Sequence, residues 1–192
     1  MKQFTVSLFL CFLLLISSCS RDESELIVPI NEVELITTVK AVFTPTSGDA
    51  NVVLEHRDLD GEGGNEPIVT ISKPFEKSKT YNGIIYLKNE LANPSIDITP
   101  EIIAEALDHQ FFYQTTGNLP PFRYANISSN FDSNGKPLGI HSVVTTTSEA
   151  SGLLQISLRH GPNKNGVNVS NGIIDNAGGA TDVEVRFNIT VE

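Results

Sequence analysis

The stretch DVEVRFNITV, residues 182–191, lies one residue before the end of the sequence. Every second residue from Val183 to Val191 is apolar, and the residues between them are polar. A period of two residues is typical of a β-strand with one buried face. Such a strand needs a second layer of structure to cover its apolar face, so this stretch predicts a domain built from packed sheets.

The same alternation recurs upstream of this last strand. In residues 152–160, Leu154, Ile156 and Leu158 would lie on one face of a strand, with polar residues on the other. The two strands are separated by a long loop, 161–180, rich in Asn, Gly and Pro. Further strands are expected over residues 35–43, 51–57, 68–71, 80–89, 109–114, 123–128 and 140–147, the first two as a hairpin and 123–128 at a sheet edge.

Residues 99–108 are the one segment with a helical period. Thr99 is expected to act as the N-cap, and Pro100 suits the first helical position. An apolar face would follow, made of Ile102, Ile103, Ala106 and Leu107. The sequence therefore predicts a single helix of about two to three turns among the strands.

Eight or nine short strands, one short helix and glycine-rich turns predict a mainly-β fold. We expect residues 34–192 to form a single antiparallel β-sandwich with immunoglobulin-like layering. A lipocalin-like β-barrel is the alternative.

The start of the chain resembles the signal segment of bacterial lipoproteins. Lys2 precedes the apolar run 8–16, which is too short to span a bilayer, and Ser17 and Ser18 then precede Cys19. In that family the cysteine thiol is acylated and the peptide is cleaved before the cysteine. The resemblance implies that residues 1–18 are a signal peptide and that acylated Cys19 anchors the chain in a lipid bilayer.

The mature protein would be an acidic, lipid-anchored domain. Cleavage before Cys19 would leave 174 of the 192 residues, and the loss of Lys2 would change the formal charge from −10 to −11. Such a charge disfavours nucleic acid as a partner. Residues 19–33 are expected to be an acidic tether, which resembles the export signal of Bacteroidetes surface lipoproteins. The expected location is the outer membrane, facing either the periplasm or the cell surface.

The mature sequence as a whole resembles a family of small flavobacterial lipoproteins. The motifs that carry the resemblance are RDLDG (57–61), TYNG (80–83), DHQFF (108–112), LRHGPNK (158–164) and NAGGATDVEV (176–185). Members of this family are often labelled as having a type 1 periplasmic binding fold. That fold alternates strands and helices around parallel sheets in two lobes, whereas the pattern here predicts a sandwich with one helix. The family association implies support of a TonB-dependent outer-membrane receptor in nutrient uptake.

One loop resembles half of a calcium site. Asp58, Asp60 and Glu62 place oxygen ligands at alternate positions before Gly63, as in the first half of an EF-hand loop. The twelfth position would be Val69, which is not an acid, so an EF-hand is excluded. The alternatives are a looser calcium site and a solvated turn between two strands.

The histidines suggest a second kind of metal site. His56, His109 and His160 all lie at predicted strand boundaries, where loops gather at the ends of a sandwich. Imidazoles with nearby carboxylates would suit zinc or copper in a mature chain whose one cysteine, Cys19, is expected to be acylated. The alternative is three independent, hydrogen-bonded histidines.

No catalytic residues are predicted. The chain has no Gly-x-Ser-x-Gly elbow, phosphate loop or dinucleotide motif, so we do not expect an enzyme. Because tryptophan is absent, any sugar-stacking platform would depend on the four tyrosines, Tyr81, Tyr86, Tyr113 and Tyr124. Two functions remain open: a ligand- or metal-binding lipoprotein that supports an uptake receptor, and a structural or adhesive surface module.

Overall fold

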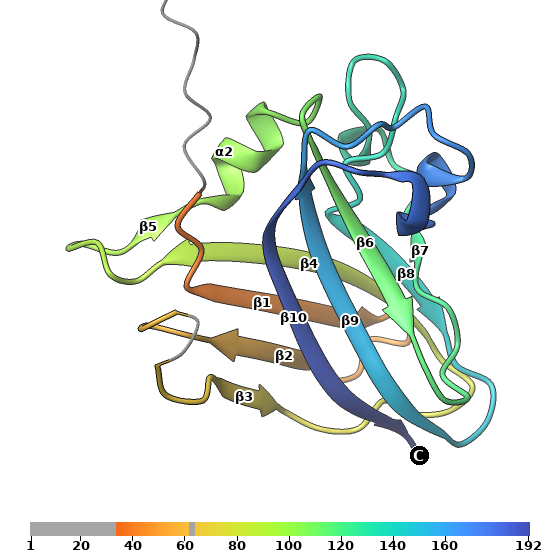
Figure 1. Ribbon diagram of the computed structural model, residues 1–192. Helices are drawn as coiled ribbons and strands as arrows, with labels where there is room; N and C mark the ends of the chain where they lie inside the picture. Colours follow the sequence, from red (N-terminus) through yellow and green to blue (C-terminus); the bar gives the residue numbers. More distant parts are fainter. Residues whose placement is uncertain (1–33, 62–63) are drawn as a thin grey trace, which may run out of the picture. The chain divides into compact units, whose positions relative to one another are not determined.

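The computed structural model describes residues 34–61 and 64–192, which form two antiparallel sheets and one α-helix (Figure 1). The larger sheet has the strand order β3-β2-β1-β4-β8-β7, with β5 paired to β4, and the smaller sheet has the order β10-β9-β6. The strands are β1 (Thr38–Pro45), β2 (Val52–Arg57), β3 (Ile68–Ile71), β4 (Thr80–Asn89), β5 (Ile96–Asp97), β6 (His109–Thr115), β7 (Arg123–Tyr124), β8 (His141–Thr145), β9 (Ala150–His160) and β10 (Ala180–Val191). The helical segments are α2 (Thr99–Ala104) and three 3-10 turns, η1 (Ser128–Asn130), η2 (Val169–Asn171) and η3 (Ile174–Asn176).

The predicted β-sandwich with one short helix is confirmed, and the described residues close into no lipocalin-like barrel. The described residues from Glu34 to Glu192 belong to one compact unit. The predicted signal peptide and the lipid-bearing cysteine with its tether lie outside the described residues. Within the described ranges, no helix is both long enough and apolar enough to cross a membrane.

The smaller sheet follows the alternation seen in the sequence. β10 pairs with β9 over its whole length, and Val185, Phe187 and Ile189 are at most 3% exposed. Leu154, Ile156 and Leu158 of β9 are buried as well. The polar residues between them face away from the core, so this sheet covers one side of the sandwich.

The larger sheet is centred on β1, which pairs with both β2 and β4. The predicted hairpin between the first two strands is confirmed, and Val39, Ala41 and Phe43 of β1 are buried. β3 and β7 are the two edge strands. All four residues of β3 are exposed, so this predicted strand extends the sheet without adding to the core.

Phe75 joins the two sheets. Its ring makes edge contacts with Phe43 at 5.3 Å, Tyr81 at 5.0 Å and Phe122 at 6.1 Å between centroids, and it is 1% exposed. Its backbone N–H donates to the carbonyl oxygen of Thr190. The segment after β3 is therefore fastened both to the core and to the end of β10.

The helix is shorter than expected and is capped differently. α2 has six residues, and Thr99 is its first residue and not its N-cap. The Thr99 hydroxyl instead accepts a hydrogen bond from the backbone N–H of Leu87 in β4, while Asp97 accepts one from the Thr99 N–H. Ile102 is buried, but Ile103 is 47% exposed, so the apolar face is narrower than the sequence predicts.

Candidate metal centre

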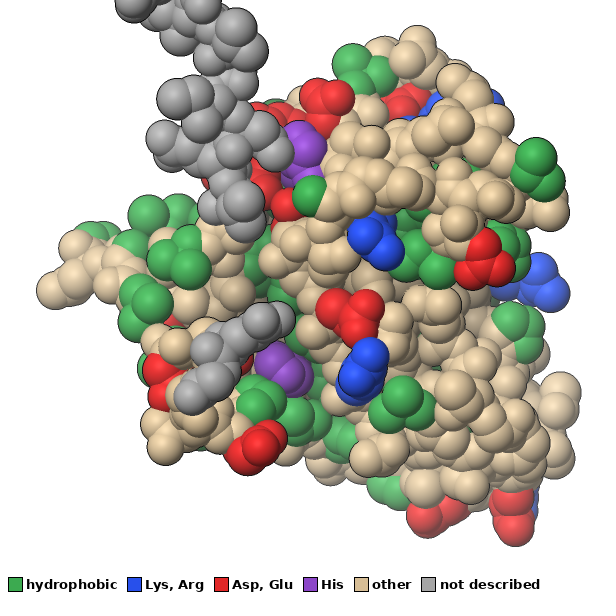
Figure 2. Space-filling view, in the orientation of Figure 1, with side chains coloured by type: hydrophobic (Ala, Val, Ile, Leu, Met, Phe, Trp, Pro, Cys, Tyr) green, Lys and Arg blue, Asp and Glu red, His purple; other side chains and the backbone are tan. Residues whose placement is uncertain are grey.

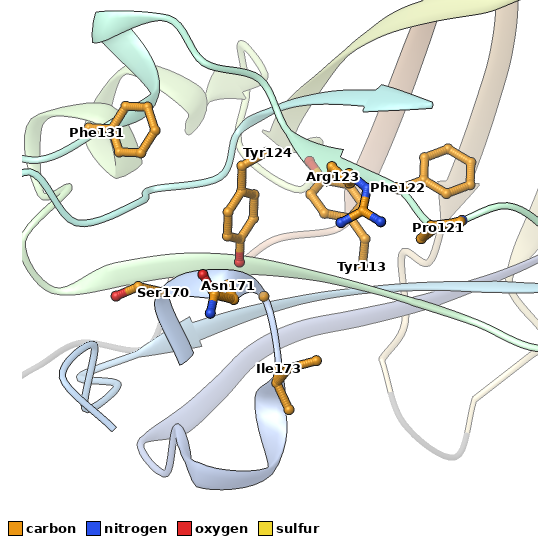
Figure 3. Close-up of a pocket in the computed structure, with 10 residues that line it drawn as sticks. Tyr113, Pro121, Phe122, Arg123, Tyr124, Phe131, Ser170, Asn171 and Ile173 are labelled. Carbon is orange, nitrogen blue, oxygen red and sulfur yellow. The ribbon is translucent and has the colours of Figure 1, made fainter. Parts of the chain in front are cut away.

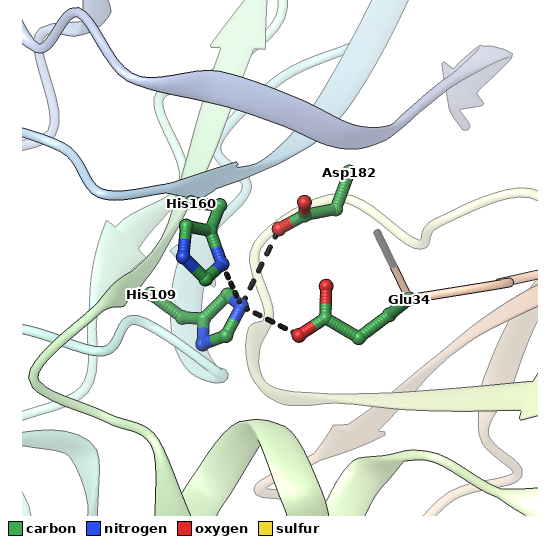
Figure 4. A group of neighbouring side chains, drawn as sticks. All are labelled: Glu34, His109, His160 and Asp182. Carbon is green, nitrogen blue, oxygen red and sulfur yellow. Dashed lines mark hydrogen bonds and ion pairs between the residues drawn. The ribbon is translucent and has the colours of Figure 1, made fainter. Parts of the chain in front are cut away.

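Four side chains from four separate segments meet at one end of the smaller sheet (Figure 4). They are Glu34, His109, His160 and Asp182, and each offers one ligand atom. These four atoms all lie within 4.8 Å of one another. We call this group the four-residue cluster.

Strand register brings the two histidines together. His109 is the first residue of β6 and His160 is the last residue of β9, and the two are direct partners across the antiparallel pair. His160 Nδ1 lies 3.0 Å from His109 Nε2, and the ring planes are nearly perpendicular, at 87°. Both residues continue the core-facing positions of their strands, Phe111 and Leu158, so their rings face inward where the core ends.

A β-bulge directs Asp182 into the cluster. Thr181 pairs with Arg159 and Val183 pairs with Leu158, so Asp182 is an extra residue with no partner on β9. In a regular strand Asp182 would point away from the face that carries Val183. The bulge changes the direction of its side chain, a role that bulges often have beside functional sites. Its side chain is 2% exposed.

Glu34 reaches the cluster from the segment that precedes β1. Its Oε1 lies 3.1 Å from His109 Nε2, and its side chain is 7% exposed. The approach of this segment is fixed by Thr37, whose N–H donates to the carbonyl oxygen of Lys88 and whose carbonyl accepts from Asp58 N–H.

The contacts of His109 show which of its ring nitrogens faces the other three side chains of the cluster. Its Nδ1 lies 3.2 Å from the backbone carbonyl oxygen of Glu105, which can only accept a hydrogen bond. Nδ1 therefore carries a hydrogen, and Nε2 faces Glu34 Oε1 and Asp182 Oδ2, at 3.1 and 3.5 Å. Metal-binding histidines typically have this arrangement, with one nitrogen bonded to a backbone carbonyl and the other on the ion.

The spacing of the ligand atoms suits one small ion. Four ligands at about 2.0–2.1 Å from a tetrahedral zinc ion lie about 3.4 Å from one another. The three distances from His109 Nε2 to its neighbours are 3.0, 3.1 and 3.5 Å. These three distances are close to those of a tetrahedral site, and the remaining ligand atoms lie within 4.8 Å of one another.

One oxygen of each carboxylate lacks a hydrogen-bond donor. Glu34 Oε2 and Asp182 Oδ2 are buried side-chain atoms with no hydrogen-bond partner among the described residues. Burial, followed by the nearby charge of Glu34, raises the pKa of Asp182 to about 6, although both histidines act in the opposite direction. Two carboxylates and two neutral imidazoles carry a charge of about −2, which a divalent cation would balance. On the face seen in Figure 2, acidic side chains gather around a histidine.

The cluster includes only part of the predicted ligand set. His109 and His160 belong to it, whereas His56, Asp58 and Asp60 do not, and Glu62 lies outside the described residues. His56 lies within β2, opposite Val39 on β1 and Val69 on β3, and burial lowers its pKa.

The carboxylates of the calcium-like loop are used to hold the loop itself. Asp58 Oδ1 accepts hydrogen bonds from the N–H groups of Asp60 and Gly61, at 3.2 and 2.9 Å. Asp60 Oδ2 accepts from the backbone and side-chain nitrogens of Asn65, at 2.9 and 2.6 Å, and these bonds lower the pKa of Asp60. Such bonds are typical of a polar turn, and the looser calcium site stays a prediction because Glu62 lies outside the described residues.

Sequence reasoning missed Glu34 and Asp182. Both are acids at the boundaries of predicted strands, which is the signal that singled out the histidines. Asp182, however, falls within the regular alternation of the last strand, and nothing in that pattern reveals a bulge. Glu34 is distant in sequence from the other three residues and meets them only through sheet packing.

Comparison with protein families, with curated proteins and with solved structures finds no significant match to this chain. The chemistry of the cluster is therefore argued from its own residues.

Proposed function

We propose that this domain binds one divalent transition-metal ion, zinc or copper(II), through Glu34, His109, His160 and Asp182. One observation carries the proposal: four ligand atoms converge within 4.8 Å, and two of the carboxylate oxygens there are buried without a donor. Burying unpaired carboxylates costs several kcal/mol unless a cation or a proton compensates them. A divalent ion would compensate both at once.

The residue types favour zinc or copper over calcium and magnesium. Two imidazole nitrogens and two carboxylate oxygens form a mixed donor set that suits zinc and copper. Calcium takes about six to eight oxygen ligands, and magnesium prefers an octahedron of oxygens. Copper(II) would bind more tightly than zinc, following the general order of affinities for divalent ions.

The number of ligands indicates a site that holds an ion without catalysing a reaction on it. Catalytic zinc sites usually have three protein ligands and keep one position open, whereas four protein ligands close the tetrahedron. The bound ion would link β6, β9 and β10 to the segment before β1. Its binding energy would then also stabilise the folded domain.

We propose further that the domain works at a membrane, anchored through acylated Cys19. An ion-binding domain in the outer membrane, facing the periplasm or the cell surface, could hold an ion for a TonB-dependent uptake receptor. Replacing Cys19 with alanine should release the protein from the membrane fraction and leave an unprocessed precursor. Membrane association equal to that of the wild type would contradict the lipid anchor.

The alternative function, a structural or adhesive module, has one observation in its favour. Ile68, Val69 and Ile71 expose apolar side chains on β3, at the edge of the larger sheet. An exposed edge strand can pair with a strand of another chain. The convergence of His109 and His160 favours metal binding over this alternative.

Calorimetric titration with zinc and with copper tests the metal site. The protein would be the mature chain, residues 19–192, with Cys19→Ser to prevent acylation. We expect one ion per chain, and a loss of most of the affinity in His160→Ala. His141→Ala, a histidine outside the cluster, is the matched control and should bind as the unsubstituted chain does. Equal binding by both variants would disprove the site.

A further inference from the structure

A cavity lies between β6, β7 and the turn η2 (Figure 3). Its volume is about 430 Å³. It shares no residue with the four-residue cluster. The lining residues on which the following inference depends are Tyr113, Arg123, Tyr124, Phe131, Ser170 and Asn171.

Two of the four tyrosines line this cavity, and internal bonds hold both in place. The Tyr113 hydroxyl donates to the carbonyl oxygen of Gly139 at 2.7 Å. The Tyr124 hydroxyl donates to the carbonyl oxygen of Phe111 at 2.6 Å and accepts from the side-chain amide of Gln110 at 2.9 Å. Because both hydroxyls are used within the protein, the two residues offer ring surface to the cavity. Tyr81, by contrast, is fully buried, and Tyr86 does not line the cavity.

Arg123 supplies a positive charge in the same cavity. Its side chain is exposed, and no Asp or Glu of the described residues lies within 4 Å of its guanidinium, whereas Arg57 and Arg186 pair with Glu90 and Glu184. No acidic residue lines the cavity. In a chain with a formal charge of −10, a guanidinium without a carboxylate beside it marks a local site for an anion.

We propose that this cavity binds a small carboxylate that carries a six-membered ring. The Arg123 guanidinium would hold the carboxylate through two parallel hydrogen bonds, the geometry in which arginine binds carboxylates most strongly. The ring would lie against Tyr124 and Phe131, which provide flat apolar surface. Ser170 and Asn171 place a hydroxyl and an amide beside it.

The size of the cavity agrees with this class of ligand. Binding pockets for small molecules have volumes of about 300–1,000 Å³ and combine apolar walls with a few polar groups. The chemistry of a carboxylate on a six-membered ring is shared by aromatic acids and by acidic sugars. A guanidinium group and tyrosine rings can bind either kind of acid, so the experiment tests one aromatic acid and one acidic sugar.

Binding can be tested with four probes on the mature chain, residues 19–192, carrying Cys19→Ser. Benzoate represents the aromatic acids and glucuronate the acidic sugars, with benzyl alcohol and glucose as their neutral counterparts. Amide chemical shifts in NMR titrations report where each probe binds. We expect at least one of the two acids to shift signals from residues 113–131 and 170–173, and to bind at least tenfold more tightly than its neutral counterpart.

Arg123→Met removes the charge and keeps much of the side-chain length. We expect it to weaken binding of the acid at least tenfold. Arg186→Met, which removes an exposed guanidinium outside the cavity, is the matched control and should leave binding unchanged. Failure of both acids to bind, or equal affinity in Arg123→Met and the unsubstituted chain, would overturn the proposal. The result does not depend on the metal site, because the titrations can be run with a chelator present.

Discussion

Two regions of this molecule gather acidic side chains at strand ends, yet they differ in what those side chains do. In the loop after β2, Asp58 and Asp60 accept hydrogen bonds from the loop itself and remain exposed to solvent or nearly so. In the four-residue cluster, Glu34 and Asp182 are largely buried and keep oxygens without donors. The loop has the sequence spacing of a metal motif, and the cluster has no motif at all. We therefore base the proposed metal site on unsatisfied, converging ligand atoms and not on sequence spacing.

A matched pair of double variants should give the largest difference between the two regions. Glu34→Gln with Asp182→Asn removes two carboxylates from the cluster, and Asp58→Asn with Asp60→Asn removes two from the loop. We expect the first pair to lower zinc affinity by more than about 100-fold, since even residues that only orient ligands contribute about 10–100-fold. The second pair should leave zinc affinity unchanged. Calorimetry at neutral pH measures both, and a similar loss in the two would contradict the comparison.

Replacing Asp182 alone should raise the stability of the metal-free domain and weaken its binding of zinc. Asp182→Asn keeps the shape of the side chain and removes a buried carboxyl group. The pKa of this group is raised to about 6. In a chelator, we expect the variant to be more stable than the unsubstituted domain by about 1–3 kcal/mol at pH 7. Excess zinc should raise the melting temperature of the unsubstituted domain and not that of the variant. If the variant were less stable than the unsubstituted domain in chelator, this prediction would be wrong, and the protein itself would already stabilise the negative charge of Asp182.

The pH dependence of the metal-free domain follows from the same group. The pKa of Asp182 is about 6 in the folded state against an ordinary 3.8, so between these values the folded state binds more protons than the unfolded state. The contribution of Asp182 to stability is therefore fully present below about pH 4 and is lost as the pH rises through about 6. Urea unfolding at several pH values should show this loss in the unsubstituted domain. The difference between it and Asp182→Asn isolates the effect from the neighbouring histidines, and a constant difference would contradict it.

The smallest effects are expected in the loop. Asp60→Asn loses part of the hydrogen bonding to Asn65 at an exposed site, where single substitutions have little effect on stability. We expect Asp60→Asn to change the melting temperature by about a degree. Added calcium should not change the melting temperature of the variant or of the unsubstituted domain. A stabilisation by calcium that disappears in Asp60→Asn would restore the loop as an ion site.

The long strands of the core could be predicted because their alternation shows which face is buried, whereas the short, exposed strand β5 was not predicted. The alternation in β10 and β9 and the polar turn between β1 and β2 depend only on nearby residues. The cap of α2 could not be predicted, because the Thr99 hydroxyl bonds to Leu87 on another strand. Two of the four residues of the candidate metal site could likewise be predicted from nearby sequence. His109 and His160 lie at strand ends that pair directly, whereas Glu34 and Asp182 depend on the packing of the sheets and on an irregularity in pairing.

The bulge in β10 makes the proposed metal site depend on the length of the chain as well as on the identity of its residues. Asp182 faces the histidines because one residue is inserted between two pairs that are otherwise in register, Thr181 with Arg159 and Val183 with Leu158. Deleting Thr181 would leave all four ligands in the sequence, yet regular pairing would turn the aspartate to the outer face of the sheet. During divergence, a relative could therefore lose the metal through a single codon deletion while every ligand in an alignment remained present.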